Sequence, residues 1–151
     1  MRIEAFLRQS PLFAVSRASR RLDVHLARVL KSGDLTFPEA LVLVSIFFEE
    51  PKPIKPSHLA ETLATTRGNV SHCVSGLETK GLVRRRIDPD DARSFQVTLK
   101  PQGRTKAMRV IRTLHRMQKD FEQHIGIADL QAALAVIERV EQVCAAQTGT
   151  E

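Results

Sequence analysis

One uninterrupted stretch, residues 57–99, constrains the fold of this chain more than any other. Its first half holds two short amphipathic segments on either side of the polar turn Ala64-Thr65-Thr66. Its second half holds two segments in which polar and apolar residues alternate. The helical spacing and the alternation predict a helix-turn-helix followed by a β-hairpin. A helix for the major groove beside a basic hairpin is a typical arrangement for reading double-stranded DNA.

The second helix of this motif should run from about Arg67 to Lys80, with Thr66 as its N-cap. Apolar residues recur at helical spacing and should face the core: Val70, Cys73, Val74 and Leu77. The residues left for the outer face are Arg67, Gly68, Asn69, Ser71, His72 and Ser75. These are small or polar groups that can contact bases or phosphates. Gly68 either permits close approach to the DNA backbone or is simply tolerated in a first turn.

The hairpin strands are expected at Val83–Ile87 and Phe95–Leu99, with Arg84 and Arg86 on one face and Arg85 on the other. We expect Asp91 to orient Arg93 or Arg85 by a charge-assisted hydrogen bond, which would fix a guanidinium for DNA. The alternative is a solvated surface ion pair worth at most about 1 kcal/mol. The loop between the strands is expected to hold Asp88, Pro89, Asp90, Asp91 and Arg93.

Positive charge is concentrated in two regions of the chain. The net charge is +6 overall, but residues 1–33 and 57–109 each carry +5, and residues 34–56 and 110–151 each carry −2. Such clustering indicates a polyanionic partner, and the alternative is a basic surface that serves solubility alone. Trp and Tyr are absent, so base stacking on aromatic side chains is not expected to be the main mode of binding.

Further helices are expected on both sides of the motif. Apolar spacing predicts a helix from about Leu12 to Leu30, ended by Gly33. Thr36 and Glu39 form a capping-box pattern before an apolar helix that reaches Phe48. After prolines 51, 53 and 56 and the central motif, a long helix should follow Pro101. It should break at Gly126, and a last helix should start near Asp129 and fray from about Gln147.

The predicted fold class is therefore mainly α with a small β-hairpin wing, in a single domain of residues 1–151. Within it, residues 35–100 form the winged helix-turn-helix. A reader of two half-sites needs a dimer, so residues 1–33 and 101–147 are expected to supply helices that pair two chains. The alternative is that these helices pack within one chain.

The chain resembles the multiple-antibiotic-resistance regulator (MarR) family of winged-helix repressors. The resemblance rests on the sequences HLAETL, LETKGLVRR and DPDDARSFQVTL followed by Gly103, and it covers residues 35–107 closely. It implies a homodimer that binds a pseudo-palindromic operator, represses transcription and releases DNA on binding a small ligand of unknown identity. It also implies DNA contacts by Arg67, Asn69, Ser71, His72 and Arg93, with Asp91 and Arg85 supporting the wing.

The chain departs from the family pattern at several positions. Ala92 stands where many members have a basic residue, and Lys100 stands where a capping Thr is usual, a change for which Pro101 compensates. The aromatic residues Tyr and Trp, which often line the family's ligand pocket, are absent. An equivalent pocket would be lined by Phe13, Arg17, His25, Phe37, Phe47 and Arg112.

The sequence gives little support for a redox switch, a metal site or an enzyme. Cys73 and Cys144 are expected to be buried structural thiols, although oxidation of Cys73 would distort the reading helix. The five histidines lack paired metal-ligand spacing, so no metal and no cofactor are expected, with a zinc sensor as the alternative. No nucleophile elbow, phosphate loop or catalytic carboxylate pair indicates an enzyme. No apolar run approaches the roughly 18 residues of a membrane span, so a cytoplasmic protein is expected.

The sequence therefore predicts a sequence-specific regulator that binds double-stranded DNA. The alternative is a winged-helix module that binds an acidic protein without reading DNA. The expected convergence of Arg67, Arg85 and Arg93 around one polar helix favours DNA over an acidic protein as the partner.

Overall fold

The computed structural model describes residues 3–30, 34–89 and 91–148. The chain folds into two compact units. The first, unit 1, consists of residues 1–25 and 115–151, and the second, unit 2, is continuous from Leu26 to Leu114. Unit 2 contains all of the predicted helix-turn-helix and hairpin, so the candidate site belongs to it alone.

Unit 2 is built on the helix α3, Phe37–Glu49. Its start is the predicted capping box: the Thr36 hydroxyl accepts the Glu39 N–H at 3.3 Å, and Glu39 Oε2 accepts the Thr36 N–H at 2.9 Å. Leu43 and Ile46 have exposed fractions of 0% and 1%, so α3 is the central buried helix, as predicted. Phe48 is 68% exposed, so the helix is not buried on every side.

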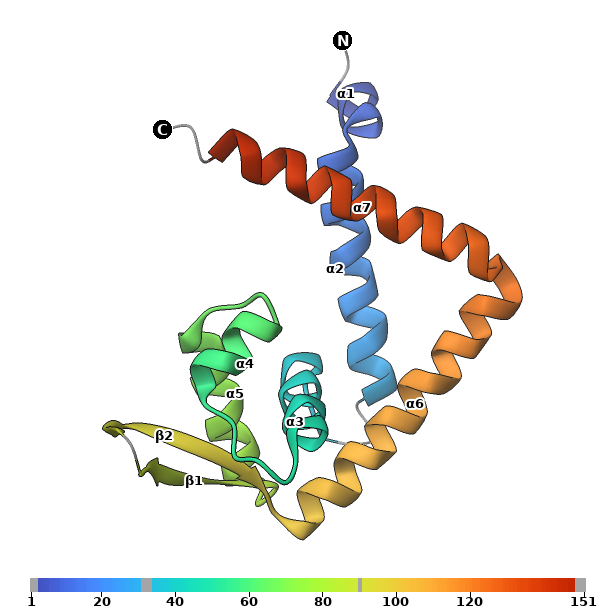
Figure 1. Cartoon of the computed structure of the whole chain (residues 1–151). Coiled ribbons are helices and arrows are strands. Elements are labelled where there is room, and N and C mark those ends of the chain that lie inside the picture. Colours follow the sequence, from blue (N-terminus) through green and yellow to red (C-terminus); the bar gives the residue numbers. More distant parts are fainter. Residues whose placement is uncertain (1–2, 31–33, 90, 149–151) are drawn as a thin grey trace. The chain divides into compact units, whose positions relative to one another are not determined.

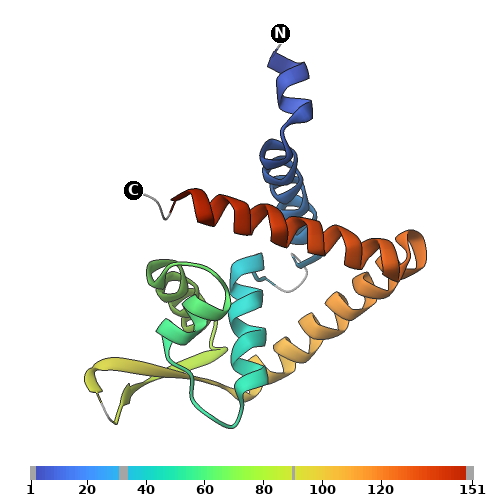
Figure 2. The same cartoon turned by 45° about the horizontal axis from the view of Figure 1, so that its top comes forward.

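The helix-turn-helix follows α3 in the predicted order. The helix α4 covers Pro56–Thr62, and α5 covers Arg67–Thr79. Between them Ala64 has a φ of 47°, a left-handed conformation that costs a side chain about 1 kcal/mol and reverses the chain within a short turn. Figures 1 and 2 show both helices beside α3, with the hairpin next to α5. The predicted α5 boundaries are confirmed within one residue, because Lys80 is the C-cap.

The wing is an antiparallel pair of strands, β1 (Val83–Asp88) and β2 (Asp91–Leu99). The predicted return strand, Phe95–Leu99, was too short, because β2 begins four residues earlier. The register steps from Ile87–Phe95 to Asp88–Asp91, so Arg93 lies in a β-bulge of β2 rather than in a loop. Ile54 adds a bridge at the other edge, exchanging both backbone hydrogen bonds with Val97 at 3.2 and 2.8 Å.

The long helix α6, Pro101–Ile125, begins directly after β2. At Gly103 its backbone approaches that of Leu82 so closely that a Cβ atom would lie 2.0 Å from the Leu82 carbonyl oxygen. Gly126, with a φ of 94°, ends α6 as predicted. The last helix, α7, covers Ile127–Thr148, so its predicted start near Asp129 is confirmed within two residues. The fraying predicted from about Gln147 concerns a tail that lies mostly outside the described residues.

At the amino end the structure has two helices where one was predicted. The short α1 covers Ile3–Gln9, and α2 covers Pro11–Leu30. Ser10 separates them, because its hydroxyl accepts the Phe13 N–H at 3.3 Å and caps α2. The predicted end at Gly33 lies outside the described residues. No helix in the described part of the chain is long and apolar enough to cross a membrane.

Candidate nucleic-acid interface

The helix α5 separates a buried face from an exposed one. Val70, Val74 and Leu77 have exposed fractions of 0%, and Cys73 has 7%, so the predicted inner face is confirmed. Thr66 caps the helix, because its hydroxyl accepts the Asn69 N–H at 3.2 Å. Within the first three turns, no acidic residue accompanies the basic and polar side chains. The exposed start of α5 therefore presents uncompensated donors to solvent.

Most of the predicted recognition residues are exposed to solvent. Thr66, Arg67, Gly68, Asn69, His72 and Ser75 are exposed or half-buried, and so is Ser71. The Asn69 amide donates to the Thr65 hydroxyl at 3.1 Å, which orients its carbonyl oxygen away from that bond. The Ser75 hydroxyl donates to the Ser71 carbonyl at 2.9 Å. This bond uses the Ser75 proton within the helix, so the Ser75 hydroxyl has no proton left to donate to DNA.

Arg85 joins the wing to α5. Its guanidinium lies 3.2 Å from Glu78 Oε2 and contacts the Ser75 hydroxyl and the Ser71 carbonyl. It also stacks over the Phe95 ring, 4.7 Å from the centroid. Two hydrogen bonds, an ion pair and a ring leave little of this cation for DNA. Arg84 and Arg86, by contrast, are exposed on the other face of β1, as the alternation predicts.

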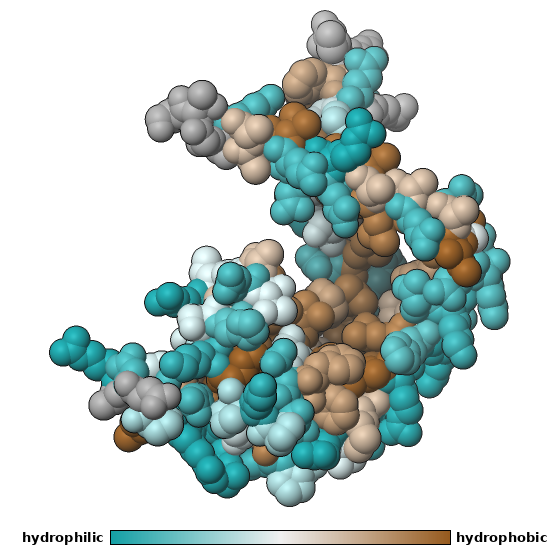
Figure 3. Space-filling model, in the orientation of Figure 1, coloured by the Kyte–Doolittle hydropathy of each residue, from teal (hydrophilic) through white to brown (hydrophobic). Residues whose placement is uncertain are grey.

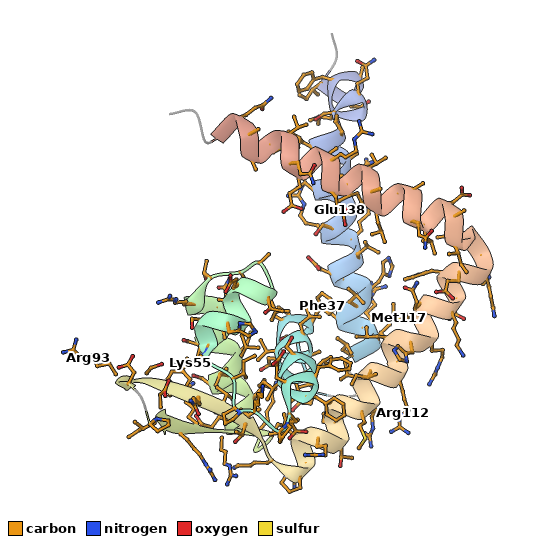
Figure 4. All side chains as sticks on the ribbon, in the orientation of Figure 1. Phe37, Lys55, Arg93, Arg112, Met117 and Glu138 are labelled. Carbon is orange, nitrogen blue, oxygen red and sulfur yellow. The ribbon has the colours of Figure 1, made fainter. Side chains whose placement is uncertain are left out.

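The expected bond between Asp91 and a guanidinium is wrong. Asp91 Oδ1 accepts the backbone N–H of Arg93 at 3.0 Å, and Arg85 binds α5. The bulge explains the difference, because it turns the Arg93 backbone toward the Asp91 carboxylate. Asp91 therefore shapes the backbone that carries Arg93. Figure 4 shows the Arg93 side chain at the outer end of the wing, pointing away from the strands.

Two charged contacts that the sequence analysis missed hold the reading unit together. Lys80 at the end of α5 donates to Glu39 Oε2 at 2.7 Å, and Lys55 before α4 lies 2.5 Å from Asp88 Oδ2 in the wing. A Cβ atom on Gly76 would lie 2.3 Å from Glu39 Oε1, so α3 and α5 meet closely at this carboxylate. The capping-box position of Glu39 was a sequence signal, whereas no local pattern marked Asp88.

The environment of Glu39 controls two ionisable groups. Burial alone would raise the pKa of Glu39, but the hydrogen bonds from Lys80 and Thr36 lower it below its ordinary value of 4.5. Burial and the charge of Glu39 raise the pKa of the Cys73 thiol above its ordinary value of 9.0. A buried thiol with a raised pKa is a poor nucleophile, which supports a structural role for Cys73. Cys144 is only half-buried, so the expectation that it is fully buried is wrong.

The residues predicted for a ligand pocket fall into both units. Phe13, Arg17 and His25 belong to unit 1, where the Arg17 guanidinium stacks over the Phe13 ring at 5.8 Å. Phe37, Phe47 and Arg112 belong to unit 2, where the two phenylalanines pack against the core. Figure 4 shows Phe37 on α3 and Arg112 on α6. A pocket shared by all six residues stays a prediction.

No cluster of three or more potential metal ligands occurs within the described ranges. The histidines of the motif, His58 and His72, lie on different helices, α4 and α5. The exposed side chains of the wing and of α5 together form a polar and cationic surface.

Comparison with known proteins agrees with this geometry. Residues 35–95 match the model of the MarR family. The transcriptional regulator PrsX of Escherichia coli is 26% identical over 87 residues, which are 58% of this chain and 52% of PrsX. This chain thus spans about half the length of that relative.

Solved structures share the fold over most of the chain. A crystal structure of a MarR family transcription regulator has a TM-score of 0.80 at 18% identity and covers 98% of this chain and 97% of its own. MepR of Staphylococcus aureus, solved in complex with DNA, has a TM-score of 0.80 at 16% identity and covers 89% and 98%. Residues 35–95, which hold the helix-turn-helix and wing, thus match the MarR family model, and the chain as a whole has the fold of the solved MarR-family structures.

Proposed function

We propose that this chain is a cytoplasmic transcriptional regulator that binds double-stranded DNA in a sequence-specific manner, as a homodimeric repressor that a small ligand releases. The observation that carries the proposal is the exposed start of α5, where Arg67, Asn69 and His72 lie without an acid beside them. The wing adds Arg93, held at its outer end by the Asp91 contact. A polar helix start and one extended arginine match a major groove and an adjacent backbone.

Unit 1 supports the homodimer. None of its described residues is buried, although it contributes most of the large hydrophobic residues that are exposed in this chain. Figure 3 shows such side chains open to solvent on the terminal helices. Amphipathic helices without a core need a partner, and a second copy of the same helices supplies a matching apolar surface. In the dimer we expect the two α5 helices to lie about 34 Å apart, one turn of DNA.

The proposed roles of individual residues follow from their placement. Arg67, Asn69 and His72 contact base edges or phosphates, Thr66 and Gly68 allow the helix start to approach the backbone, and Ser71 and Ser75 line the flank of the same helix. Arg93 contacts phosphate or the minor groove, with Asp91 and Arg85 in supporting positions. Release by a small ligand is proposed from the family resemblance alone. The chain is proposed to have no catalytic activity.

The test is a fluorescence-anisotropy titration of the protein against its own upstream DNA and a scrambled duplex, at two salt concentrations. We expect tight, saturable preference for the upstream duplex. Arg93→Ala should weaken binding to both duplexes and lower the slope of log affinity against log salt by about 0.9, the value for one phosphate contact. Lys52→Ala, an exposed lysine outside the interface, is the matched control.

Other results would change the proposal in different ways. Equal, weak binding to both duplexes would mean that the target lies elsewhere or that a required ligand is missing. An Arg93→Ala slope equal to that of the wild type would remove the wing from the interface. No binding at low salt would instead favour a winged-helix module that binds a protein. Duplex DNA should then fail to displace that protein partner.

A further inference from the structure

A carboxylate is buried at the outer end of the wing. Asp88, the last residue of β1, is only 1% exposed, although it lies at the end of the hairpin. The Lys55 ammonium lies 2.5 Å from its Oδ2 atom, and the Gln96 amide donates to its Oδ1 atom at 3.2 Å. Burying a carboxylate costs several kcal/mol unless it is paired and hydrogen-bonded, and these contacts pair both of its oxygens.

The pair joins two parts of the reading unit. Lys55 is the N-cap residue of α4, and the residue before it, Ile54, forms the bridge to Val97 at the edge of the wing. Asp88 stands at the other end of the contact, where the register of the hairpin breaks. Figure 4 shows Lys55 beside the strands and Arg93 at the outer end of the same wing. The wing is therefore held near its tip as well as at its base.

Asp88 is also connected to Arg93 through the hairpin itself. Asp88 pairs with Asp91 across the strands, and the Asp91 carboxylate accepts the backbone N–H of Arg93 at 3.0 Å. A series of contacts thus leads from α4 through the buried carboxylate to the backbone that carries the arginine. Movement of Asp88 would change where the Arg93 side chain points.

We propose that Lys55 and Asp88 are a positioning pair, which fixes the wing tip against α4 so that Arg93 reaches the DNA backbone. The inference rests on the proposed function and adds a role for two residues that do not themselves touch DNA. Neither side chain needs to contact a phosphate, because Asp88 is buried and the Lys55 charge faces it.

The first test needs no DNA. Amide hydrogen–deuterium exchange of peptides from residues 83–99 is measured by mass spectrometry in the wild type, Asp88→Asn, Lys55→Met and Lys52→Met. Lys52→Met removes an exposed lysine three residues away and is the matched control. We expect exchange at least several-fold faster in Asp88→Asn and Lys55→Met, and unchanged in Lys52→Met. Wild-type exchange in a folded Lys55→Met would overturn the proposal.

The second test measures DNA affinity for a random duplex at 50 and 200 mM salt. Losing one phosphate contact lowers the salt slope by about 0.9, which is about a threefold smaller change in affinity over that range. We expect this reduction in Arg93→Ala, in Asp88→Asn and in Lys55→Met, but no further reduction when Asp88→Asn and Arg93→Ala are combined. A pair that only stabilises the fold would leave the slope unchanged in the folded variants.

The outcomes separate this inference from the function on which it rests. Independent effects of Asp88→Asn and Arg93→Ala, which would multiply in the double variant, would overturn the positioning role. If Asp88→Asn or Lys55→Met does not fold, the combined variant Lys55→Met/Asp88→Asn decides, because it removes the ammonium and the buried charge together. If the wild type binds no duplex, the proposed function fails, and the exchange experiment still decides whether the pair holds the wing.

Discussion

At the scale of single residues, the structure depends on groups that serve two purposes. Glu39 caps α3 through Thr36 and at the same time binds Lys80 at the end of α5. Its side chain is 10% exposed, so the Lys80 ammonium offsets the cost of burying its charge. The carboxylate therefore couples the start of one helix to the end of another.

Replacement of Glu39 should show a pH-dependent loss of stability. The pKa of Glu39 is lowered in the folded protein, so its contribution is present above about pH 4.5 and is lost as the pH falls through the folded value. We expect Glu39→Gln to lower the free energy of unfolding by about 1–3 kcal/mol at pH 7. The difference from the wild type should shrink below pH 4.5. Urea unfolding of both proteins between pH 3 and pH 7 tests this prediction. An equal loss of unfolding free energy at pH 3 and pH 7 would contradict it.

Two glycines of the reading unit should respond in opposite ways to a methyl group. A Cβ atom on Gly103 would strike the Leu82 carbonyl, whereas one on Gly68 would lie 3.8 Å from its nearest neighbour, Thr66 Oγ1. Gly103→Ala should therefore destabilise the protein by about 1–3 kcal/mol, and Gly68→Ala should stabilise it by up to about 1 kcal/mol. Thermal unfolding measures both. Weaker DNA binding by a stabilised Gly68→Ala would favour close approach to DNA, the alternative left open by the sequence.

At the scale of elements, the helix-turn-helix was predictable and the wing was only partly so. The apolar spacing of α5 and the caps at Thr36 and Thr66 are local signals, and the structure confirms them. The bulge that holds Arg93 depends on pairing between β1 and β2, which no local pattern contains. Long-range contacts explain the missed partners too, since Lys80 is 41 residues from Glu39.

The contact between α5 and the wing should be measurable as an energy. Arg85 lies on β1, and its partner Glu78 lies on α5; their side chains are 30% and 41% exposed, so solvent screens the pair. We expect Arg85→Ala to destabilise the protein by about 1–2 kcal/mol through the lost hydrogen bonds and ring stacking. A double-mutant cycle with Glu78→Ala should give a coupling of about 0.5–1 kcal/mol. Strict additivity in urea unfolding would show that the two residues act separately.

At the scale of the whole molecule, the two units differ in how they are stabilised. Unit 2 contains every residue of the buried core, from Leu30 to Val110. In unit 1 the amphipathic pattern predicted the helices correctly. The pattern could not show, however, that none of the described residues of these helices is buried within one chain. Packing against a second chain is a property of the assembly, which a single sequence encodes only as unpaired apolar surface.

A charge on the apolar stripe of α7 should dissociate the proposed dimer. Leu134 is 60% exposed on that helix, and its neighbour Gln131 is exposed and polar. We expect Leu134→Glu to shift the molar mass toward that of one chain in light scattering and to weaken DNA binding at least tenfold. Gln131→Glu adds the same charge and should keep the wild-type mass. A dimer that survives Leu134→Glu would place the interface on other helices.

The lack of buried residues in the described part of unit 1 also bears on the fate of a newly made chain. Before it meets a second copy, such a chain should carry a folded reader attached to helices that proteases and chaperones recognise as unfinished. Subunits made in excess over their partners should therefore be short-lived, and the pool of regulator should consist of completed pairs. Limited proteolysis at falling protein concentration should cut the terminal helices first and leave residues 35–100 intact.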